Sequence, residues 1–119
     1  MRLDKWAVTA QEALQAAVGI ATDASAGQVQ PVHLLKALLG SGERNLRAII
    51  ERVGADPASI EAQTDQAIAN QPQVTGDAAQ MGVGQDLVRV GDAAERLASK
   101  MGDSYVTSEH LLCAQLSPR

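Results

Sequence analysis

The sequence predicts an all-α fold of two pseudo-repeated helical units, the second of them truncated. Three observations support this: apolar residues recur at helical spacing along most of the 119 residues, alanine is abundant, and a His-Leu-Leu motif occurs twice. Alanine has the highest helix propensity of all residues. Only Trp6 and Tyr105 are aromatic, so we expect a thin core of Leu, Ile, Val and Ala.

The first two helices are expected at 4–24 and 31–39. In the first, apolar residues return every three or four positions, Asp4 is a suitable cap and Gly27 is the expected terminator. Pro31 suits the first position of the second helix, because its missing N–H would have no intrahelical partner there.

Two further helices are expected at 43–53 and from Pro57 to about Asn70. Gly54 can end the earlier one as a left-handed cap, and Asp56 before Pro57 is the clearest helix start in the chain. The later helix is expected to turn four residues inward: Ile60, Thr64, Ala67 and Ile68.

The helical pattern stops at 71–84, where Pro and Gly predict a loop or linker. It resumes in a helix at 85–101 that ends at Gly102, and a last helix at 108–116 is capped by Thr107. The first of these carries an apolar stripe with flanking residues: Leu87, Val90, Ala94 and Leu97, flanked by Val88, Ala98 and Met101. No strand is expected in the sequence.

An internal duplication becomes visible when the second half is shifted back by 77 positions, so that His110 falls on His33. Eight positions then agree in class: His110 with His33, Leu111 with Leu34, Leu112 with Leu35, Val106 with Val29, Leu116 with Leu39, Ala94 with Ala17, Leu97 with Ile20 and Ala98 with Ala21. We therefore predict one domain, 1–119, with a first unit at 1–70, a linker at 71–84 and a partial second unit at 85–119.

The chain offers little for catalysis or metal binding. Zinc sites need three or four ligands in local pairs, and there are only two histidines and one cysteine. We interpret His33 and His110 as structural residues that pair with open backbone groups in the first turn of their helices. Cys113 aligns with Lys36 in the repeat and is interpreted as an inert thiol at the core edge. No phosphate-loop signature is present, so we expect no catalytic residue, metal or cofactor in this chain.

Charge and composition narrow the choice of partners and compartment. A net charge of -4 with scattered Lys and Arg argues against nucleic-acid binding. A single cysteine suits a reducing compartment, and the sequence shows neither a signal-peptide pattern nor a membrane span, so we expect a cytoplasmic location. Three acidic residues lie near helix starts: Asp86, Asp103 and Glu109. Their negative charge suits the helix dipole there, so helix capping and partner binding are both open as their role. Without catalytic residues, we expect a binding module with an apolar groove between the repeats.

Five motifs together resemble the N-terminal domain of the ClpB family of protein-disaggregating chaperones, a branch of the Clp AAA+ group: MRLD, PVHLLKALL, PQVTG, QDLVRV and GDSYVTSEHLL. The resemblance covers nearly the whole chain. It implies two four-helix units joined by a linker and attached flexibly to the ATP-driven ring of a hexamer. ATP and Mg²⁺ would then be bound by ATPase modules that this chain lacks.

The resemblance also implies that the domain binds apolar stretches of unfolded or aggregated protein. The residues implied for an apolar groove and its acidic neighbours are Leu87, Val88, Val90, Gly91, Asp103, Glu109, His110 and Leu111. Gly91 and Ala93 stand where relatives often carry larger apolar residues, which implies a shallower groove. The alternative is an adaptor-docking N-domain of a ClpA- or ClpC-type unfoldase, since these share the HLL element; a stand-alone enzyme is disfavoured.

Overall fold

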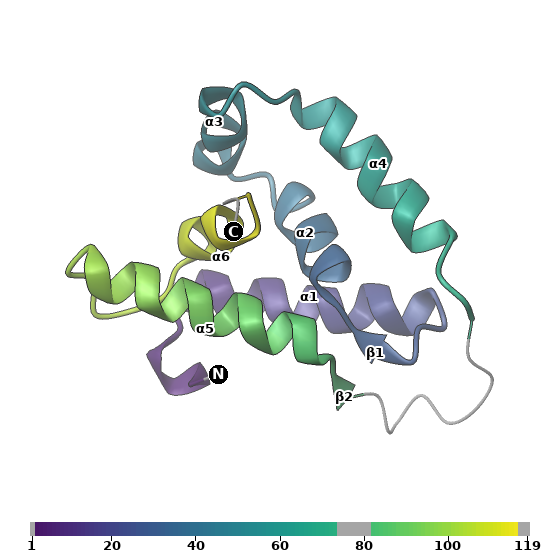
Figure 1. Cartoon of the computed structure of the whole chain (residues 1–119), viewed down its shortest axis with the longest axis horizontal. Helices are drawn as coiled ribbons and strands as arrows, with labels where there is room; N and C mark the ends of the chain where they lie inside the picture. The colour runs from purple at the N-terminus through teal and green to yellow at the C-terminus, as the bar shows by residue number, and fades with distance from the viewer. Residues whose placement is uncertain (1, 74–81, 117–119) are drawn as a thin grey trace.

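A computed structural model describes residues 2–73 and 82–116 of the chain, and these residues are mainly helical (Figure 1). In chain order the elements are the 3-10 turn η1 (Leu3–Lys5), α1 (Val8–Asp23), β1 (Gln28–Val29), α2 (Pro31–Leu39), α3 (Arg44–Arg52), α4 (Pro57–Ala69), β2 (Gly82–Val83), α5 (Gln85–Lys100) and α6 (Ser108–Leu116). The expected all-α class is confirmed. Residues 74–81 of the expected linker lie outside the described residues.

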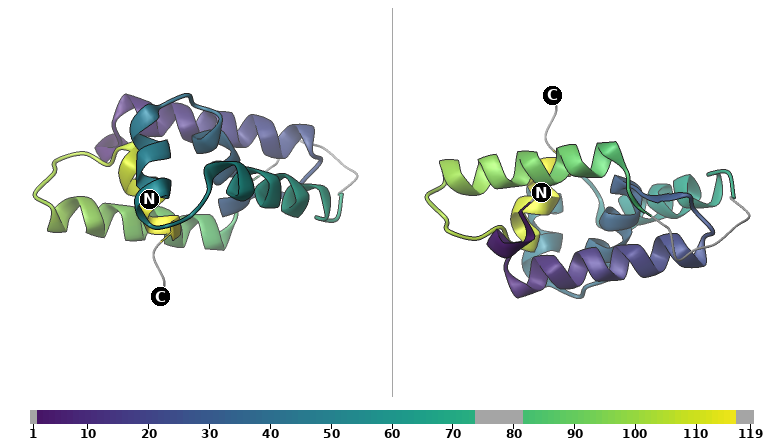
Figure 2. Two further views of the ribbon diagram at one scale, coloured as in Figure 1. Left: turned by 90° about the horizontal axis from the view of Figure 1, so that it is seen from above. Right: turned by 90° about the horizontal axis from the view of Figure 1, so that it is seen from below.

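The helices form a layered arrangement in which α2 and α6 occupy the middle. Figure 2 shows α1 and α5 running along opposite sides of this pair. α1 packs on α2, α5 packs on α6, and the two inner helices contact each other. α3 and α4 extend from one end of α2, and α4 packs back against α2 (Figure 1).

The start of α1 differs from the sequence prediction. Asp4 lies in the 3-10 turn, Trp6 is extended, and the helix begins only at Val8. The cause is a tertiary contact: the Ala7 N–H donates to the Val106 carbonyl at 2.7 Å. The N-cap position of α1 is Ala7, so the assignment of Asp4 as its cap is wrong.

A residue in the left-handed conformation follows α1, α3 and α5, although the terminator of α1 differs from the predicted one. Gly54 and Gly102 have φ of 85° and 78°, as expected for left-handed glycine caps. After α1, however, the left-handed residue is Ser25 (φ 56°) and not Gly27. The position of Ser25 corresponds to Gly102 under the 77-residue shift, so the two units end their first helices in the same way.

The prediction that no strand forms is wrong, because β1 and β2 pair in parallel with Val29 opposite Val83. A second parallel bridge joins Trp6 to Val106. The 77-residue shift relates Trp6 to Val83 and Val29 to Val106, so the two pairings are equivalent. Trp6 and Val29 belong to the predicted first unit, whereas Val106 lies in the predicted second unit and Val83 at the end of the predicted linker. The placement of the unit limits at 1–70 and 85–119 stays a prediction.

The core is built from Leu, Ile, Val and many Ala residues, as the composition suggested, together with Trp6. Its buried apolar members are Trp6, Ala10, Ala13, Ala17, Ala21, Val29, Leu34, Ala37, Leu38, Leu46, Ile50, Leu87, Ala94, Ala98, Val106, Leu111 and Leu112. Thr64 is buried as expected, but Ala67 and Met101 are exposed, so their expected inward positions are wrong. Both residues lie near the ends of their helices. The apolar periodicity of the sequence continues there, but these two side chains do not pack into the core.

We expect Ala17→Leu to destabilise the domain by about 1–3 kcal/mol, because Ala17 is fully buried and a larger side chain overpacks the α1 face. Ala16→Leu is the matched control, since Ala16 is exposed on the same helix and its replacement is expected to stay within about 0.5 kcal/mol of the parent. Urea unfolding followed by circular dichroism measures both. Equal stabilities of the two variants would contradict close packing along this face.

Candidate functional site

Both histidines close the first turn of equivalent helices. His33 Nδ1 accepts the backbone N–H of Gln30 at 2.9 Å, and His110 Nδ1 accepts the backbone N–H of Thr107 at 2.9 Å. Each ring satisfies a backbone donor that the helix leaves open, which is the role that Glu or Gln plays at this position of a capping box. The structural interpretation of the two histidines agrees with this geometry.

His110 has a further partner that distinguishes the second unit from the first. Because its Nδ1 accepts a hydrogen bond, the ring proton lies on Nε2, which donates to Asp103 Oδ2 at 2.9 Å. The His110 side chain is 5% exposed and that of Asp103 is 47% exposed. The bond therefore ties an exposed carboxylate in the α5–α6 loop to a buried ring. The position equivalent to Asp103 in the first unit is Ala26, which has no such group.

The residues implied for an apolar groove divide between the core and the surface. Those buried in the core are Leu87, Gly91, His110 and Leu111; Val88 and Val90 are half-buried, and Asp103 and Glu109 are exposed. The buried four cannot contact a partner directly in this conformation, because the inward faces of α5 and α6 pack within the core. The implied groove stays a prediction, and in this conformation Leu87 and Leu111 belong to the core.

Two of the exposed large apolar side chains belong to the α5–α6 loop. Met101 is 62% exposed and Tyr105 is 56% exposed, close in sequence to Asp103 and Glu109. Val8, 69% exposed, begins α1 next to Ala7, whose N–H is hydrogen-bonded to the carbonyl of Val106 at the end of the same loop. Figure 2 shows this loop and the start of α1 at the same end of the molecule. We name the surface of Val8, Met101, Asp103, Tyr105 and Glu109 the loop-end surface.

Sequence reasoning identified the acidic members of the loop-end surface but missed the apolar ones. Tyr105 carried a usable signal, since it is one of only two aromatic residues and follows a helix-ending glycine. Asp86 does not belong to this surface, because it starts α5 at the opposite end of the helix and pairs with Arg89 at 3.3 Å.

Comparison with known proteins assigns the chain to a family. The family model of the Clp repeat (R) N-terminal domain matches residues 5–119. The chain belongs to this family. Among curated relatives, the chaperone proteins ClpB of Agrobacterium fabrum and Rhodopseudomonas palustris are 36% and 35% identical over 114 and 115 residues, 96% of this chain and 13% of each relative. That of Mycobacterium tuberculosis is 33% identical over 102 residues, 86% of this chain and 12% of the relative.

Solved Clp N-terminal domains share the fold. The Hsp104 N-terminal domain from Candida albicans has a TM-score of 0.83 with 19% identity, covering 95% of this chain and 74% of that one. The N-terminal domain of the caseinolytic protease associated chaperone ClpD from Arabidopsis thaliana has a TM-score of 0.60 with 19% identity, covering 96% and 77%. The chain is thus an N-terminal Clp repeat domain like those of ClpB chaperones, and it spans only 12–13% of the length of these relatives.

The remaining chemistry of this Clp domain is sparse. Burial, with a smaller contribution from Glu109, raises the pKa of the Cys113 thiol, which keeps it in the less nucleophilic neutral form. No group of three or more metal-ligating side chains occurs within residues 2–73 and 82–116. Over the same residues, no helix is long and apolar enough to span a bilayer.

We expect the Clp domain to lose stability on acidification through His33. Burial lowers the pKa of His33 from its ordinary 6.5, although the neighbouring Gln71 side chain opposes this. As pH falls below about 6.5, the unfolded chain therefore takes up a proton first. The stabilisation that neutral His33 gives the folded domain is therefore fully present above pH 6.5. It is lost as the pH falls toward the lower pKa of His33 in the folded state.

Urea unfolding at several pH values measures the effect, with His33→Gln as the comparison. Glutamine can still accept the Gln30 N–H but does not titrate, so the variant should show a shallower loss of stability below pH 6.5. Identical pH slopes for the parent and the variant would show that His33 is not the group responsible.

Proposed function

We propose that this domain captures exposed apolar segments of unfolded or aggregated proteins through the loop-end surface. The observation that carries the proposal is the combination of exposed Met101 and Tyr105 with an Asp103 carboxylate fixed by a buried histidine. Exposed apolar side chains on an ordered frame can bury the apolar groups of a flexible chain. Family membership and the ClpB relatives support a chaperone context for this capture.

The charges of the surface favour a particular kind of segment. Asp103 and Glu109 are both exposed, and the chain as a whole has a net charge of -4. Lys or Arg beside the apolar residues of a client would meet these carboxylates, whereas Asp or Glu would be repelled. We therefore propose a preference for apolar segments flanked by basic residues.

In this proposal the domain binds but does not catalyse. The longer protein would supply an ATP-driven hexameric ring, with ATP and Mg²⁺ bound in its ATPase modules, and the Clp domain would deliver clients to that ring. The second candidate is docking of a folded adaptor, as in ClpA- or ClpC-type unfoldases. The observation that favours it is the fold shared with the N-terminal domain of the protease-associated chaperone ClpD.

Tyr105→Ser is expected to weaken binding of a permanently unfolded polypeptide about three- to tenfold, because a half-exposed aromatic contact is lost. Titration of reduced, carboxymethylated α-lactalbumin into ¹⁵N-labelled domain gives the affinity and the perturbed amides. Val53→Ser is the matched control, since Val53 is 61% exposed at the end of α3. Equal losses in both variants, or shifts absent from residues 101–109, would disprove the proposed surface.

Replacing the two carboxylates tests the charge preference. Asp103→Asn combined with Glu109→Gln should weaken binding of a Lys-flanked apolar peptide about two- to fivefold, and the effect should shrink at high salt. Asparagine keeps an acceptor for His110, so the loop remains tied. Glu51→Gln is the control on the exposed side of α3. Unchanged affinity in the double variant would remove the acidic residues from the site.

A further inference from the structure

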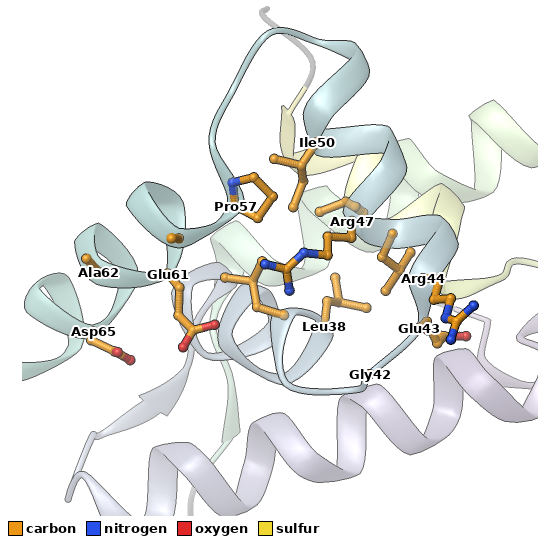
Figure 3. A pocket seen from close by; sticks show the side chains of 14 residues that line it. Leu38, Gly42, Glu43, Arg44, Arg47, Ile50, Pro57, Glu61, Ala62 and Asp65 are labelled. Atoms are coloured by element: carbon orange, nitrogen blue, oxygen red, sulfur yellow. The ribbon is translucent and has the colours of Figure 1, made fainter.

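A pocket of about 620 Å³ opens between α2, α3 and α4 (Figure 3), and none of its lining residues belongs to the loop-end surface. Its floor consists of Leu38, Leu46 and Ile50, with Leu112 of α6 behind them, and each of these side chains is at most 3% exposed. The volume falls within the usual range of ligand sites. An aliphatic side chain inserted between α3 and α4 would meet this apolar floor.

The two walls of the pocket carry opposite charges. Arg44 and Arg47 line it from α3, and Glu61 and Asp65 face them from α4 (Figure 3). Within the described residues neither arginine forms an ion pair. Lys36 Nζ lies 2.8 Å from Asp65 and 3.8 Å from Glu61, so two carboxylates share one ammonium group and the α4 wall stays net negative.

Glu43 is an acid on the arginine side of the pocket. Its Oε2 accepts a hydrogen bond from Ser108 Oγ at 2.8 Å, which directs the carboxylate toward α6. With Arg44 and Arg47 included, the α3 side keeps a net positive charge. A matching ligand therefore needs an apolar group for the floor, an anion for α3 and a cation for α4.

We propose that this pocket binds a short polypeptide segment in which an aliphatic side chain lies between an acidic and a basic residue. A peptide carries these three groups within a few residues. A fatty acid has no cation, and a nucleic-acid strand would bring its phosphates against Glu61 and Asp65. The proposal does not depend on the loop-end surface, because the two sites share no residue.

Three acetylated, amidated heptapeptides with a common central leucine test the charge pattern. One has Glu on one side of the leucine and Lys on the other, the second has Lys on both sides, and the third has Glu on both sides. In ¹⁵N titrations the mixed peptide should bind at least about threefold more tightly than the other two, with shifts in residues 42–47 and 58–65. Equal binding of all three, or shifts confined to residues 101–109, would overturn the proposal.

Variants of exposed residues then locate the contacts without disturbing the core. Arg44→Gln combined with Arg47→Gln should weaken the mixed peptide about fivefold, whereas Arg52→Gln on the same helix should have no effect. Ala62→Trp should fill the pocket and abolish binding, while Ala67→Trp, outside the pocket on the same helix, should not. The proposal would be overturned if the control variants weakened binding as much as the test variants. It would also be overturned by concentration-dependent shifts without peptide, because these would indicate a second copy of the chain as the occupant.

Discussion

Two short parallel pairings hold the halves of this Clp domain together, and the positions of its long helices depend on them. Trp6 pairs with Val106, and Val29 pairs with Val83. Trp6 precedes α1 and its partner precedes α6. Val83 precedes α5 and its partner precedes α2. Since α1 and α5 begin directly after Trp6 and Val83, the pairings set where these helices start. In the folded domain, each pairing satisfies backbone groups of one segment with those of the other.

Close helix packing follows from this arrangement and from the small residues that line it. The fully buried residues of α1 are all alanines, with Leu14 and Ile20 partly buried against the core, and α5 buries Ala94 and Ala98 beside Leu87. Small side chains let helices approach closely but bury little apolar area each. Trp6 adds bulk where one pairing forms, and its indole N–H donates to Glu95 at 3.2 Å. The same Glu95 oxygen accepts the Arg2 N–H, which fixes the N-terminal turn against α5.

Local signals predicted the helices well and the contacts between units poorly. Pro31 and Asp56 mark true helix starts, because caps act within one turn. The start of α1 and both strands depend on backbone bonds to residues far away in sequence, which no local pattern contains. The burial of Leu87 could not be predicted for a related reason: an apolar stripe on α5 looks the same whether it faces a partner or the core. Only packing showed that Leu87 faces the core, whereas Asp103 reaches solvent.

The duplication explains which features the units share and where they can differ. His33 and His110 each accept the backbone N–H at the start of their helix, α2 or α6. Every copy of the fold has this open N–H, so both units keep the histidine. The carboxylate that holds His110 has no counterpart in the first unit, where Ala26 occupies the equivalent position. The fold does not require this interaction, because the first unit forms without it. If Asp103 contributes to the proposed capture surface, its bond to a buried ring would limit the entropy lost when a flexible partner binds beside it.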